Sequence, residues 1–142
     1  METIRELERY LEEECYSFHE ISIGKHCACE GIVIEREGGR FEFGYSERGC
    51  RRVLKSFAEE KELVRYALAE LKADEWLKGH LAAFAYNKTE IEDAEKELND
   101  MGIRFKRNDI PQYKCGRYAY RIFVFGRDIL RLDEFKKNHL RP

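Results

Sequence analysis

The sequence predicts an α+β fold, in which a largely antiparallel sheet of about five to six strands packs against three to four helices. Three segments begin with a helix cap signal and continue with apolar residues at helical spacing. The segments between them alternate apolar and polar residues and are joined by short turns, which is typical of antiparallel strands. The predicted order is α-βββ-α-(α)-α-ββ(β)-α. A single domain over residues 1–142 is expected, because this length suits one compact domain.

The helices are predicted from pairs of cap residues, a serine or threonine followed three residues later by glutamate. Each pair precedes a stripe of apolar residues with a period near 3.6. Helices are expected over about 4–14, 57–72 and 90–101, and a short fourth one near Asp133. Gly102 suits the left-handed residue that ends the third helix. The three cap pairs are Thr3 and Glu6, Ser56 and Glu59, and Thr89 and Glu92.

The strands are predicted from alternation and from turn residues. Gly38 and Gly39 favour a tight hairpin turn, and residues 122–125 are apolar on both faces, which predicts a central strand. Residues 128–132 are expected to add an edge strand. Residues 76–87 are ambiguous and suit either a longer helix or a strand over 81–86. The other expected strands are 16–23, 27–36, 40–46, 103–107 and 118–125.

Composition excludes several classes of protein. The chain carries 26 basic and 28 acidic residues, a net charge of −2, which excludes a strongly basic coat protein for nucleic acid. The apolar content of 43% excludes a disordered chain. The longest apolar run, 81–86, is far shorter than the ~20 residues of a membrane span. The N-terminus lacks the pattern of a secretory signal, so a cytoplasmic protein is expected.

Charge is distributed unevenly along the chain. Residues 1–37 carry 4 basic and 10 acidic residues, a net charge of −6, whereas residues 104–142 carry 11 and 4, a net charge of +7. Such asymmetry can create a dipolar surface that steers a charged partner. The alternative is that the two ends lie together in the fold and neutralise each other.

Cysteine and histidine spacing indicates neither a disulfide framework nor a metal site. Five cysteines are an odd number, which makes a disulfide framework unexpected. Cys27 and Cys29 are expected to be small buried apolar residues. Cys27 and Cys29 lie beside His26, but a zinc knuckle needs a second pair at ligand spacing. The four histidines have no ligand or catalytic spacing to one another. We therefore expect no metal and no cofactor.

Enzyme motifs are missing: no phosphate loop, dinucleotide fingerprint, nucleophile elbow or metalloprotease helix occurs in the sequence. Asp109 with Lys106 and Arg107 has the composition of a metal-dependent nuclease site, provided that another acid such as Glu42 lies on a neighbouring strand. A solvated turn before Pro111 explains the same residues. No catalytic residue is therefore predicted, and the chain is expected not to be an enzyme.

A mixture of aromatic and basic side chains in the last third suits nucleic-acid binding. Bases stack on such rings, and arginines hold phosphates. The residues are Tyr113, Arg117, Tyr118, Tyr120 and Arg121. The signature of an RNA-recognition motif is absent, and amphipathic strands explain the same residues.

Residues 45–49 (YSERG), 94–102 (AEKELNDMG), 105–109 (FKRND) and 120–128 (YRIFVFGRD) together resemble the small immunity proteins encoded beside bacterial polymorphic or contact-dependent toxins. The resemblance implies a non-enzymatic cytoplasmic protein that binds the effector domain of a toxin and blocks its active site. No membrane partner is implied, and a nucleic-acid partner or a nuclease activity around Asp109 remains the alternative. The residues expected to contact the toxin are Glu35, Glu37, Glu42, Tyr45, Glu47, Arg48, Trp76, Tyr86, Asp109 and Tyr113.

Overall fold

The chain folds into two compact units, Met1–Lys78 and Gly79–Pro142. The computed structural model describes residues 1–140. Each unit contains its own sheet and its own apolar core. The α+β class is confirmed, but the expectation of one sheet of five to six strands is wrong, because the strands form one sheet of four and one of three. That residues 1–142 behave as a single domain stays a prediction.

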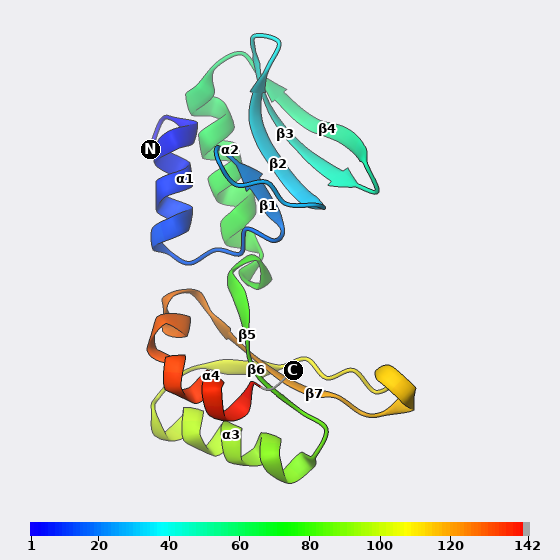
Figure 1. Ribbon diagram of the computed structural model, residues 1–142. Helices are drawn as coiled ribbons and strands as arrows, with labels where there is room; N and C mark the ends of the chain where they lie inside the picture. The colour runs from blue at the N-terminus through cyan, green and yellow to red at the C-terminus, as the bar shows by residue number, and fades with distance from the viewer. Residues whose placement is uncertain (141–142) are drawn as a thin grey trace. The chain divides into compact units, whose positions relative to one another are not determined.

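The first unit is a four-stranded sheet with two helices against one face (Figure 1). The strand order is β1-β2-β3-β4; β1 runs parallel to β2, and the other neighbours are antiparallel. Hydrophobic residues of both helices, such as Leu7 and Leu63, pack on Ile34 and Phe43, which face each other across β2 and β3. Its elements are α1 (Ile4–Glu13), β1 (Ile21–Ile23), β2 (Gly31–Glu37), β3 (Arg40–Glu47), β4 (Cys50–Phe57), α2 (Glu60–Ala73) and the 3-10 turn η1 (Glu75–Lys78).

The second unit is a three-stranded antiparallel sheet with α3 and α4 packed on one face (Figure 1). The strand order is β5-β7-β6, so β7 is the central strand, as its apolar sequence predicted. Its elements are β5 (Gly79–Ala85), α3 (Lys88–Asp100), β6 (Phe105–Arg107), the 3-10 turn η2 (Lys114–Gly116), β7 (Tyr120–Phe125), the 3-10 helix η3 (Gly126–Arg131) and α4 (Asp133–His139).

The two faces of β7 differ in character. Ile122 and Val124 are fully buried beneath α3 and α4. Because side chains alternate along a strand, Arg121, Phe123 and Phe125 point to the opposite face. We call this second face the outer face of the sheet.

Of the three predicted cap pairs, only the first is confirmed. The hydroxyl of Thr3 accepts the amide of Glu6, and the Glu6 side chain accepts the amide of Thr3. Ser56 instead lies in β4, where its hydroxyl accepts a hydrogen bond from Arg40, and α2 begins at Glu60. The cap of α3 is Asn87, whose side chain accepts from two amides of the first turn.

The strand predictions are correct in part. The turn at Gly38 and Gly39 is confirmed, with positive φ at both residues, and residues 76–87 contain β5 rather than a longer helix. The edge strand predicted over residues 128–132 is wrong, because these residues belong largely to η3. The segment 16–23 contains only the short β1, and β4 was missed. The short turn between β3 and β4 contains Arg48 and Gly49, both with positive φ.

Candidate functional site

A groove on the second unit brings aromatic and basic side chains together. Its volume is about 600 Å³, and we call it the aromatic groove. Three rings from the end of β5 and the β6–β7 connection contact one another at its wall: the Phe84 centroid lies 5.2 Å from that of Tyr86 and 5.5 Å from that of Tyr113. The residues that line the groove are Leu81, Phe84, Tyr86, Tyr113, Lys114, Arg121 and Leu140.

Positive charge is held close to these rings. The guanidinium of Arg117 lies 3.6 Å from the centroid of Tyr86, an arrangement typical of a cation–π contact. Lys114 is exposed and lies 5.8 Å from the ring of Tyr113. Arg121 faces Phe84 across β7 and β5. The groove therefore offers flat apolar surfaces beside three cations.

The β6–β7 connection that carries Tyr113 and Arg117 is an ordered hairpin rather than a loose loop. The amide and carbonyl groups of Ile110 and Ala119 exchange hydrogen bonds of 2.9 and 2.8 Å. At the tip, the amide of Tyr113 donates to the carbonyl of Arg117 at 2.8 Å. The tip turns through Cys115, which has a φ of 59°. This closure holds Arg117 next to Tyr113, which lines the groove.

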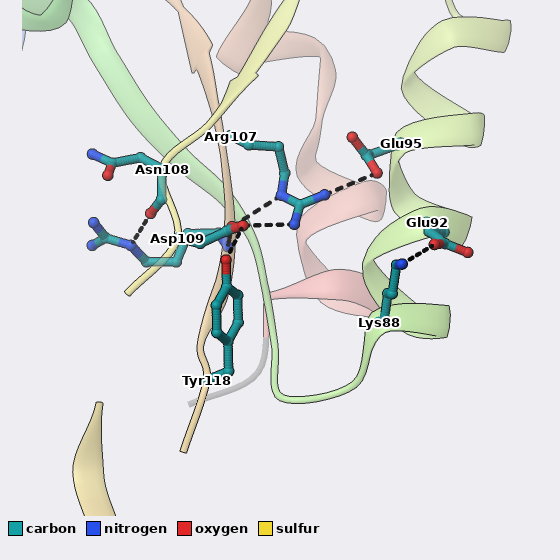
Figure 2. Close-up of polar contacts among 8 residues, drawn as sticks. Lys88, Glu92, Glu95, Arg107, Asn108, Asp109 and Tyr118 are labelled. Atoms are coloured by element: carbon teal, nitrogen blue, oxygen red, sulfur yellow. Dashed lines mark hydrogen bonds and ion pairs between the residues drawn. The ribbon is translucent and has the colours of Figure 1, made fainter. Parts of the chain in front are cut away.

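Asp109 anchors the base of this hairpin (Figure 2). Its carboxylate accepts two hydrogen bonds from Arg107, at 2.9 and 2.7 Å, and one from the hydroxyl of Tyr118 at 3.1 Å. The amide of Arg121 donates a fourth at 3.0 Å. Arg107 also donates to Glu95 of α3 at 3.1 Å. The network therefore fixes the strand position from which Arg121 reaches the groove.

The same contacts keep Asp109 ionised. Burial alone would raise the pKa of its carboxyl, but the hydrogen bonds from Arg107, from the Arg121 amide and from Tyr118 outweigh burial and hold the pKa below its ordinary value. The Asp109 hydrogen bond correspondingly raises the pKa of Arg107. Glu42, proposed above as a second acid, lies in the sheet of the other unit and not on a strand next to Asp109. The geometry makes Asp109 a structural anchor.

Charge is polarised within the second unit. The unit carries 13 basic and 10 acidic residues, a net charge of +3, whereas the first unit carries 13 and 18, a net charge of −5. Helix α3 alone contributes six acidic residues. Between 104 and 121 the chain has six basic residues and one acidic residue, the paired Asp109. Positive charge therefore gathers on the strands and the hairpin, and negative charge on α3.

Six of the ten residues expected to bind a toxin lie in the first unit, on β2, on β3 or in the turn that follows β3. Glu35 and Glu42 are cross-strand neighbours, and Arg51 of β4 forms ion pairs with both. Arg51 therefore neutralises part of the negative charge of these two glutamates. Tyr45 is 39% exposed and points to the opposite face of the sheet. The others are Glu37 at the end of β2, Glu47 at the end of β3 and Arg48 in the turn that follows.

The remaining four expected residues divide between the units. Trp76 lies in η1 of the first unit. Tyr86 and Tyr113 lie together in the aromatic groove, whereas Asp109 lies at the base of the hairpin. Of the aromatic residues considered for nucleic-acid binding, Tyr120 packs against the core instead.

The sequence did not identify Phe84 and Lys114 as groove residues, and it led to a wrong prediction of cysteine burial. Phe84 lies in the segment 76–87, which suited either a helix or a strand, so the sequence did not show to which side its ring would point. Four of the five cysteines are exposed, and Cys15 is half-buried. The expectation that Cys27 and Cys29 are buried is wrong because residues 27–30 form a loop rather than a strand.

A second cluster was also missed: Glu8 and Glu12 of α1 lie beside His26. Their spacing of four residues places the two carboxylates on one helix face. That spacing is the signal that the sequence contained. The partner histidine, 14 residues further along, could be found only from the fold.

Comparisons with protein-family models, with curated proteins and with solved structures find no match to this chain. In the described residues, no helix is both long and apolar enough to cross a membrane.

Proposed function

We propose that the chain binds nucleic acid through the aromatic groove. The observation that carries this proposal is one groove lined by three aromatic rings and two cations, Lys114 and Arg121, with the guanidinium of Arg117 held on the ring of Tyr86. Nucleic acid is the common ligand that combines flat apolar rings with a regular row of negative charges. Both parts have a counterpart in the groove.

Stacking is the first part of the interaction. Tyr86 is 37% exposed, and Phe84 supports it from the side in an edge-to-face contact. A base that stacks on an aromatic side chain contributes roughly 1–3 kcal/mol. Rigid, pre-positioned rings lose little conformational freedom on binding.

Phosphate binding is the second part. Lys114 and Arg117 are exposed at the tip of the hairpin, and Arg121 also lines the groove. Arg121 already donates from Nε to the carbonyl of Asn108 at 2.7 Å, which holds its guanidinium in place. The concentration of acidic residues on α3 would repel phosphate from the helix side of the unit and so favour the sheet side.

The test is fluorescence anisotropy of labelled oligonucleotides with the full chain, in separate arms for single strands and duplexes of DNA and RNA. We expect binding that weakens steeply with salt. Arg117→Ala and Lys114→Ala should each reduce the slope of log K against log salt by about one. Tyr86→Ala should weaken binding by about 5- to 100-fold with little change in that slope.

Lys96→Ala is the matched control, because Lys96 is an exposed cation of the same unit on α3. It should leave binding nearly unchanged. Undetectable binding in every arm at low salt contradicts the proposal, as does a Lys96→Ala effect equal to that of Lys114→Ala.

A toxin-neutralising immunity protein is the second candidate function, and the edge of the first sheet favours it. In the described residues, β4 pairs only with β3. Val53 and Leu54 on β4 are 45% and 49% exposed. An effector domain with an acidic edge strand could extend this sheet by main-chain hydrogen bonds, next to the basic side chains Arg51, Arg52 and Lys55.

Co-expression with the toxin gene adjacent to its own tests this second function. Growth should be rescued, and the two proteins should purify as a stoichiometric complex. Leu54→Asp should abolish both effects, whereas Leu130→Asp, at a residue 63% exposed in the other unit, should leave them intact. Failure of the unaltered chain to protect growth contradicts the immunity function and leaves the nucleic-acid proposal untouched.

A further inference from the structure

A histidine and two glutamates meet on the first unit, and none of the three lines the aromatic groove or is expected to bind a toxin. Nε2 of His26 lies 2.8 Å from Oε2 of Glu12 and 3.9 Å from Oε2 of Glu8. One ligand atom from each residue lies within 4.8 Å of the other two. We propose that Glu8, Glu12 and His26 bind a divalent transition-metal ion of the Zn²⁺ type.

The distances suit a single ion. Zinc bonds to nitrogen and carboxylate oxygen are about 2.0–2.2 Å long. Two ligand atoms on one tetrahedral ion therefore lie roughly 3.2–3.6 Å apart, which follows from those bond lengths. The separations from His26 Nε2 to the two glutamates, 2.8 and 3.9 Å, lie on either side of this range, and all three ligand atoms lie within 4.8 Å of one another, so small side-chain rotations would bring them around one ion.

The histidine is held in place before any ion binds. The backbone of His26 exchanges hydrogen bonds of 3.0 and 2.9 Å with that of Ile23, which closes a tight turn. The ring of Phe18 stacks on the imidazole, with centroids 3.6 Å apart and an angle of 12° between the planes. These contacts aim Nε2 at the helix.

The glutamates are also oriented. Glu8 accepts the backbone amide of Lys25 at 2.8 Å, and its carboxylate occupies the space where a Cβ on Gly24 would stand. The side chains of Glu8 and His26 are only 15% and 21% exposed, and that of Glu12 is 35% exposed. Such a hydrogen bond to a ligating carboxylate is typical of the outer shell of a metal site.

The charge of the cluster favours a cation. Two carboxylates, those of Glu8 and Glu12, meet one imidazole in this cluster. The neighbouring cation is Lys25, whose Nζ lies 3.3 Å from Glu12 on a side chain that is 74% exposed. A mobile, hydrated ammonium is readily displaced by a divalent ion. Imidazole nitrogen favours zinc or its neighbours over Mg²⁺ and Ca²⁺, which prefer oxygen alone.

The competing interpretation is that His26 simply fastens the turn to α1 through its contact with Glu12. The two interpretations differ in what added metal does. Isothermal titration of the chelator-treated full chain with Zn²⁺ should show one equivalent bound, with a rise in the midpoint of thermal unfolding. Co²⁺ should bind in the same place and give a visible spectrum without thiolate charge-transfer bands.

Variants separate the cluster from the exposed thiols of Cys27 and Cys29. His26→Gln and Glu12→Gln should each weaken zinc binding by about 100-fold or more. His19→Gln, at an exposed histidine of the same unit, and the double variant Cys27→Ser with Cys29→Ser should bind as the original chain does. Glu12→Gln keeps a hydrogen-bonding side chain, so its unfolding midpoint without metal shows whether the fold is intact.

Three results would overturn the proposal: no zinc binding by the original chain, unchanged affinity in a folded Glu12→Gln variant, or loss of binding on removal of the two thiols alone. None of these results bears on the nucleic-acid experiment, because the cluster and the aromatic groove lie in different units.

Discussion

An Ile122→Ala variant is expected to unfold with a free energy lower by about 2–5 kcal/mol than that of the original chain. Ile122 is fully buried at the middle of β7, the central strand of the second sheet, and packs in a core shared with α3 and α4. Truncation to alanine removes three carbon atoms and leaves a cavity. The strands on either side of β7 hold the neighbouring side chains in place, so they cannot fill it. Urea denaturation followed by circular dichroism measures the loss.

Leu130→Ala is the control, since Leu130 is 63% exposed and should change stability by less than about 0.5 kcal/mol. An Ile122→Ala chain as stable as the control would mean that this strand does not pack as described.

The same variant tests whether residues 1–142 unfold as a single domain. Leu63→Ala makes the equivalent cavity in the core of the first unit, and Trp76, the one tryptophan of the chain, reports on that unit by its fluorescence. In a single cooperative domain, both variants shift the fluorescence and circular dichroism transitions together. Two transitions, each sensitive to only one variant, would show that the units unfold separately.

Helices were easier to predict than sheets for a local reason. The residues that begin and end a helix lie within a few positions of each other, so Thr3 with Glu6 and Gly102 after α3 could be identified from the sequence. The helix cap predicted at Ser56 is wrong, because a residue that suits a cap can also lie in a strand that pairs with its neighbour. Phe57 pairs with Phe41 across β3 and β4, so the strand extends through the serine.

The division into two sheets could not be predicted, because strand alternation does not identify the partner of a strand. The residues of β4 are almost all exposed and form no apolar stripe that would predict a strand. This strand forms because it pairs with β3. The same limit applies to the sites. Tyr86 and Tyr113 lie 27 positions apart, and His26 meets Glu12 only through the turn at Ile23. Side chains distant in sequence become neighbours through packing, which no local pattern records.

Replacing Asp109 by alanine is expected to destabilise the second unit by about 2–3 kcal/mol, between the cost of an unsatisfied neutral group and that of a broken buried ion pair. The side chains of Asp109 and Arg107 are 15% and 29% exposed, so the guanidinium that loses its partner is only partly hydrated. Tyr118 and the Arg121 amide lose their acceptor as well. Glu95→Gln, which weakens one contact of the same arginine, should cost less than about 1 kcal/mol.

Acid provides an independent measure of the same carboxylate. The pKa of Asp109 in the folded chain lies below its ordinary value of 3.8, so the unfolded chain takes up the proton first as the pH falls. The stabilisation from Asp109 is therefore complete above about pH 5 and is lost as the pH falls through 3.8 toward the folded pKa. In urea denaturation from pH 7 to pH 3, the original chain should lose more stability than Asp109→Asn, which lacks this titration. Equal losses in the two chains would mean that Asp109 does not hold its charge in the folded state, and the anchor of the hairpin would have to be sought in other residues.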